Sequence, residues 1–123
     1  MGGVLLAGCA QSAWQGSLIG LGDLAGGSNY SEAYSISADG AVVVGYSLAS
    51  SGGAGFRWTE AGGIASTGDL FGGTISSINR AVSGNGLVVV GASSSSTGWQ
   101  ASRWDSGGLS GLGDLAGGSF RSE

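Results

Sequence analysis

The hydrophobic residues of this 123-residue chain fall in short blocks separated by Gly and Ser, rather than along the face of a long helix. Three valines occupy 42–44 and three more occupy 88–90, a pattern typical of strands buried on both faces. Between them, Phe56 and Trp58 alternate with Arg57, which is the period of a strand with one apolar face. Blocks of this kind predict an all-β chain.

Turn signals join these blocks into hairpins. Asp39-Gly40 and Asn85-Gly86 are strong short hairpin signals, because a two-residue type I′ turn needs positive φ at both central positions. The glycines that follow the valine runs indicate a second backbone packed closely against the strand. The strands expected in this way are 33–38, 41–48, 55–60, 64–67, 81–84, 87–93, 101–105 and 109–112.

The same blocks recur at a fixed spacing. The segment LGDLAGGS at 21–28 returns as GDLFGGT at 68–74 and as LGDLAGGS at 112–119. The aspartate of this segment recurs after 46 residues, from Asp23 to Asp69, and again after 45 residues, at Asp114. The hairpin turns, the valine runs and the strands that carry Trp58 and Trp104 also recur 46 residues apart. A fixed period of this length predicts a repeat architecture.

Each repeat is therefore predicted to form one small antiparallel sheet. We expect four-stranded units of about 45 residues, at about 21–66 and 67–111, with the start of a third at 112–123. Four antiparallel strands per unit is the pattern of a β-propeller blade, so we expect a partial β-propeller. A stacked β-solenoid is the alternative, since both folds stack one unit's sheet on the next. A few stacked units without polar caps are expected to be marginally stable or to associate.

We divide the chain into an N-terminal segment at 1–13 and a β-repeat region at 14–123. Residues 6–9 in the first segment match the bacterial lipobox, in which Cys9 would carry a lipid, but no basic and apolar leader precedes them. Either the true start lies upstream or the match is chance. In the second case Cys9 is a small buried residue in the tail of a truncated repeat.

Composition limits the partners and the chemistry. The net charge is −4, with four arginines and neither Lys nor His, so the clustered cations of a nucleic-acid binder are missing. No apolar run is long enough for a transmembrane helix. Without His or Lys, and with one Cys, the usual bases and nucleophiles are missing too. We expect no cofactor, no metal and no enzymatic activity.

These residues resemble the HAF repeats, a bacterial family of extracellular repeats. Residues 34–45 follow the family's hairpin and Val-Val-Gly pattern, and 56–59 follow the end of its third strand. The resemblance covers about residues 18–123, but the family's His is absent and Ser102 replaces its Phe. It implies a propeller-like fold, a location outside the cytoplasm, including autotransporter passengers, and no established catalytic residues.

Two sets of recurring side chains are candidates for sites. One Asp per unit, at 23, 69 and 114, would bind calcium or sugar, but calcium needs several carboxylates together. A structural role as an acceptor for backbone N–H groups is the preferred interpretation. Asp39 and Asn85 are interpreted as turn residues that tolerate the left-handed region, and their exchange between units argues against catalysis.

Tryptophans and arginines recur as well. Trp14, Trp58 and Trp104 stand at one position per unit, and we interpret them as packing residues between sheets. Trp99 has no counterpart and follows a Ser-rich stretch, so it is the candidate for a ligand contact. Arg57 and Arg103 are assigned to a solvated strand face, with Glu60 and Asp105 as alternative ion-pair partners.

Three functions remain open at this stage. The first is a non-catalytic extracytoplasmic scaffold or adhesion module, whose partners are further repeats of the same protein, a second copy, or a carbohydrate or cell-surface ligand. The second is a carbohydrate-binding or glycoside-processing propeller whose active residues lie outside this segment, because a glycosidase needs two carboxylates at a fixed distance. The third is a lipid-anchored envelope protein, which depends on Cys9.

Overall fold

A computed structural model describes residues 16–116, 122 and 123. In this part of the chain all regular structure is strand, which confirms the all-β prediction. The strands are β2 (Gly26–Ile36), β3 (Val42–Ala49), β4 (Gly52–Thr59), β5 (Gly63–Ser66), β6 (Gly72–Val82), β7 (Val89–Ser95), β8 (Gly98–Asp105) and β9 (Gly108–Gly111).

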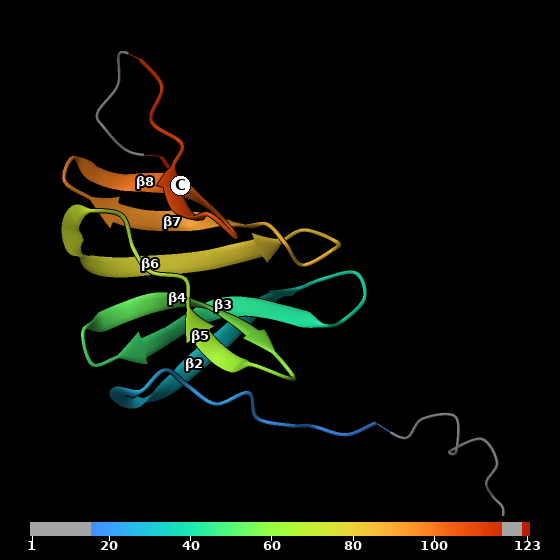
Figure 1. The fold of residues 1–123 in the computed structure, drawn as a ribbon. Coiled ribbons are helices and arrows are strands. Elements are labelled where there is room, and N and C mark those ends of the chain that lie inside the picture. Colours follow the sequence, from blue (N-terminus) through green and yellow to red (C-terminus); the bar gives the residue numbers. More distant parts are fainter. Residues whose placement is uncertain (1–15, 117–121) are drawn as a thin grey trace, which may run out of the picture.

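The strands form two groups with the same topology. β2, β3, β4 and β5 pair antiparallel in chain order, and β6, β7, β8 and β9 do the same. We call these groups the first and the second repeat unit. One parallel pair, Gly53 with Ser76, joins β4 to β6 and makes one eight-stranded sheet. The described strands thus form an open sheet, and neither a closed propeller nor a solenoid (Figure 1).

The two units also meet face to face, and we call this contact the junction. Val42 and Val44 of β3 pack against Val89 of β7, and Val82 and Trp104 close the cluster. Figure 1 shows the second unit stacked on the first, with β6 next to β4. Because facing sheets exclude water from both surfaces, one face of the first unit is buried by the second.

The opposite face of the first unit is covered by the chain that leads into β2. Val43 and Phe56 lie there, against Leu24, with Trp58 and Ile64 at the margin. The valine run at 42–44 is therefore buried on both faces, as predicted.

The second valine run is buried on one face. Val89 is 1% exposed, but Val90 is 41% exposed, whereas its counterpart Val44 is fully buried. The prediction of burial on both faces is wrong for this run, because no further unit covers the second one in the described structure.

The hairpin turns differ from the predicted type. Gly40 and Gly86 have φ near +75°, but among the described residues only glycines have positive φ. Neither Asp39 nor Asn85 adopts the left-handed region, so the predicted two-residue type I′ turn is wrong. Instead, Gly40 N–H donates to the carbonyl of Ser37 at 2.9 Å, which places Ala38 and Asp39 at the centre of a four-residue β-turn. The glycine then takes the left-handed position after it.

Close backbone approach at the glycines after the valine runs is confirmed. A Cβ at Gly45 would lie 1.9 Å from the carbonyl oxygen of Glu32, and one at Gly91 would lie 1.9 Å from that of Ile78. In both units the register of the first strand pair shifts beside this glycine. Glycine is required there because the neighbouring strand bulges towards it.

The first strand of each unit is longer than predicted. β2 and β6 have 11 residues each and begin inside the recurring Gly-Gly segment. A Cβ at Gly27 would lie 2.6 Å from the backbone of Leu48, so only glycine lets the strand begin this close to β3. The glycines therefore extend the strand rather than interrupt it.

We predict that Gly91→Ala destabilises the protein by about 3 kcal/mol, because the new Cβ meets backbone rather than a movable side chain. Gly84→Ala is the matched control. Its Cβ would lie 3.5 Å from Ala38, and the first unit carries alanine at the same position. We expect it to change the free energy of unfolding by less than about 1 kcal/mol. Urea denaturation measures both, and equal effects would contradict this account.

Candidate functional site

The recurring aspartates do not gather into a site. Among the described residues no three acidic, Cys or His side chains lie close enough to hold a metal ion. Asp114 accepts a hydrogen bond from the N–H of Leu115 at 2.9 Å. The N–H groups of Leu24 and Leu70, which follow Asp23 and Asp69, donate instead to serine hydroxyls of β3 and β7.

The turn residues Asp39 and Asn85 play matching structural roles. Asp39 accepts hydrogen bonds from the Ser37 hydroxyl at 2.6 Å and from the N–H of Ala41 at 3.0 Å. Asn85 makes the same two contacts with Ser83 and Leu87, at 2.7 and 3.1 Å. The Ser37 hydrogen bond, with that from Ala41, lowers the pKa of Asp39. The side-chain oxygen therefore closes the turn, and an amide serves as well as a carboxylate.

The recurring tryptophans that the structure describes lie against core clusters. Trp58 packs beside the Val43 and Phe56 cluster, and Trp104 beside the valines of the junction. Cys9 and Trp14, the two candidates near the N-terminus, lie outside the described residues.

Arg57 joins the two units, so its assignment to a solvated strand face is wrong. Its Nη2 and Nε donate to the carbonyl oxygen of Gly86 at 3.1 and 3.3 Å. Its guanidinium carbon lies 5.5 Å from the centre of the Trp104 ring, a cation–π distance. Arg57 thus connects β4 of the first unit with a turn and a strand of the second.

A recurring serine also builds the junction, and sequence reasoning missed it. The Ser77 hydroxyl donates to the carbonyl of Gly68 at 2.8 Å and accepts from the N–H of Gly55 at 2.9 Å. It is 2% exposed and connects the linker between the units to the middle of β4. The regular spacing of Ser31, Ser77 and Ser122 is the signal that would have found it.

Asn79 completes the polar part of the junction. It is 3% exposed, and its Nδ2 donates to the carbonyl of Phe56 and to the Thr67 hydroxyl, both at 2.9 Å. Its side chain lies over Gly55, where a Cβ would come within 2.6 Å of it. Its counterpart in the first unit is Ala33, so recurrence could not have pointed to it.

Several residues that differ between the units line one groove. An open groove of about 350 Å³ runs along β6, and we call it the variable groove. Its lining is Tyr46, Ser76, Ser77, Ile78, Arg80, Ala92, Trp99 and Glu123. Apart from Ser77, the lining residues of β3 to β8 have a different residue at the equivalent position of the other unit.

The large aromatic side chains of the groove come from different strands. In the first unit Tyr46 covers Gly53, whose Cβ would lie 2.1 Å from the tyrosine hydroxyl. In the second unit the counterpart of Gly53 is Trp99, and the counterpart of Tyr46 is Ala92. Trp99, the predicted ligand contact, is therefore half-buried in the groove wall rather than free in a loop.

A tyrosine and acid cluster borders the groove on the β2 side. The rings of Tyr30 and Tyr46 meet edge to face, with centres 6.3 Å apart. Tyr30 and Tyr34 both donate to the Glu32 carboxylate. Partial desolvation raises the pKa of Tyr34, and the hydrogen bond and negative charge of Glu32 add to this, while Arg80 opposes it. Aromatic faces with a nearby guanidinium are suited to binding a polar ligand with an apolar face.

Comparison with known proteins identifies no relative. No family model matches the chain, and no curated protein or solved structure is significantly similar to it. Among the described residues there is no helix long and apolar enough to cross a membrane.

We predict that Ser77→Ala lowers the free energy of unfolding by about 1–3 kcal/mol, because the buried N–H of Gly55 loses its acceptor. Ser31→Ala is the matched control. That hydroxyl donates to Gly22 at 2.7 Å but is exposed, so its loss should cost less than about 1 kcal/mol. Urea denaturation of both variants measures the difference. A larger loss from Ser31→Ala would show that the junction does not depend on Ser77.

Proposed function

We propose that this chain is a non-catalytic, extracytoplasmic β-repeat scaffold that presents a ligand-binding groove, as in an adhesion module. The observation that supports this most is the division of roles between residues. Most residues that hold the turns and the junction recur from unit to unit, with Asn79 as an exception, whereas the residues that line the variable groove differ, apart from Ser77. A repeated frame that carries a groove of non-repeated residues is typical of a binding protein.

The repeat frame supports a partial propeller as the parent architecture. Two four-stranded antiparallel units are stacked face to face, as successive blades are. We propose membership of the HAF-repeat class on the hairpin and tryptophan-strand residues, and with it a location outside the cytoplasm.

A carbohydrate is the ligand we favour for the variable groove. Tyr46 and Trp99 offer ring faces to the apolar side of a sugar, and Arg80 and Ser76 offer hydrogen-bond donors. The volume of about 350 Å³ lies at the small end of ligand sites, which suits a short saccharide.

A glycoside-processing propeller is the second candidate function. Hydrolysis would need two carboxylates about 5–9.5 Å apart across the glycosidic bond. The lining of the variable groove includes one, that of Glu123. The catalytic residues of a glycoside-processing propeller would therefore lie outside this segment, and the variable groove would bind the saccharide without cleaving it.

The test is binding of the purified chain to immobilised neutral and acidic oligosaccharides. We predict that the chain retains a subset of these and that Trp99→Ala weakens retention about tenfold, since it removes a stacking face. Phe71→Ala is the control, because Phe71 is 98% exposed and does not line the groove. Absence of binding, or equal loss in both variants, would contradict a carbohydrate site in this groove.

A further inference from the structure

The outer face of the second repeat unit carries the groups that build the junction on the first unit. It comprises Val88, Val90, Ala101 and Arg103, the counterparts of Val42, Val44, Gly55 and Arg57. On the first unit this face is buried by the second unit, and on the second unit it is open. We propose that the outer face of the second unit is the docking surface for a third repeat unit of the same pattern.

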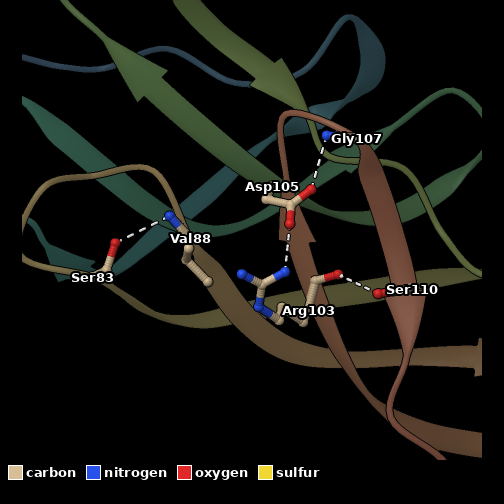
Figure 2. Close-up of polar contacts among 6 residues, drawn as sticks. All are labelled: Ser83, Val88, Arg103, Asp105, Gly107 and Ser110. Atoms are coloured by element: carbon tan, nitrogen blue, oxygen red, sulfur yellow. Dashed lines mark hydrogen bonds and ion pairs between the residues drawn. The ribbon is translucent and has the colours of Figure 1, made fainter.

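Arg103 has a different partner from its counterpart Arg57 in this structure. Its counterpart Arg57 reaches across to the next unit, but Arg103 pairs with Asp105 of its own strand. Figure 2 shows this pair, with the second oxygen of Asp105 accepting the N–H of Gly107 at 2.8 Å. Both side chains are about 40% exposed, so the ion pair contributes little and is readily exchanged. A docked unit would offer Arg103 a turn carbonyl and a tryptophan ring instead.

Two hydrogen bonds equivalent to those of Ser77 in the junction are present on the second unit. The Ser122 hydroxyl donates to the carbonyl of Gly113 at 2.7 Å and accepts from the N–H of Ala101 at 3.0 Å. These repeat the contacts of Ser77 with Gly68 and Gly55. Ser122 therefore lies on the second unit in the manner of Ser77 of β6 on the first unit.

The rest of that face contains a groove of about 390 Å³. Val90, Ala101 and Leu112 are among the residues that line it. In the junction the equivalent space is filled by Asn79, which hydrogen bonds to Thr67. Because Leu112 stands in place of Thr67, we infer that the docking unit carries a small apolar residue here, like Ala33, rather than asparagine.

The experiment extends the full 123-residue chain after Glu123 with a copy of residues 33–66, which continues the repeat in register. We expect a higher urea midpoint than that of the 123-residue chain. Arg103→Ala should lower the midpoint of the extended chain and leave that of the 123-residue chain unchanged. Arg57→Ala should lower both. The proposal would be overturned if the extended chain had the same urea midpoint as the 123-residue chain, or if Arg103→Ala did not change the midpoint of the extended chain.

A second measurement uses the 123-residue chain itself, should the extended chain not fold. A synthetic peptide of residues 33–66 is titrated into it, and binding is followed by isothermal titration calorimetry. We expect saturable binding that Val90→Lys abolishes and that Phe71→Ala does not change. No binding, or binding insensitive to Val90→Lys, would overturn the proposal. Failure of carbohydrate binding would not affect either result, because the docking face and the variable groove are tested by different variants.

Discussion

Burial of the Val42 and Val44 face by the next unit is the interaction on which this structure depends. A four-stranded sheet of about 40 residues has two faces, and here each face carries apolar side chains. One unit alone would leave one of them in water, at a cost of about 25 cal/mol for each Å² exposed. The junction removes that cost by placing Val89 and Trp104 against the two valines. We therefore expect stacking to contribute to the stability of both units during folding rather than to follow it as a separate assembly step.

Polar groups decide how the units stack. The contact between valine side chains is non-directional, whereas Ser77, Asn79 and Arg57 each form hydrogen bonds with specific backbone groups of the neighbouring unit. All three act across a boundary where strand pairing provides one bridge, between Gly53 and Ser76. Hydrophobic burial thus supplies the stability of the junction, and these side chains fix its register.

The sequence predicted the strands well where the period was strong. The first valine run, the hairpin glycines and the glycines facing a bulge lie where expected, because their local geometry leaves few alternatives, whereas the second valine run is buried on one face only. The turn type was wrong since Asp39 closes the turn with its side chain rather than adopting positive φ. Arg57 was misassigned because its partners, Gly86 and Trp104, lie in the next unit. The variable groove could not be predicted, since residues that do not recur gave no signal until the strands placed them together.

We infer that the two units fold as one cooperative body held by the junction. Native-state hydrogen exchange of the 123-residue chain tests it most directly, with the amides of β3 and β7 as reporters of each unit. If the claim holds, the slowest amides of both strands exchange with the same free energy of opening, and the N–H of Gly55, bonded across the junction, belongs to the same set. If β3 and β7 open with separate free energies, while Gly55 exchanges freely, the units are independent and the claim is wrong.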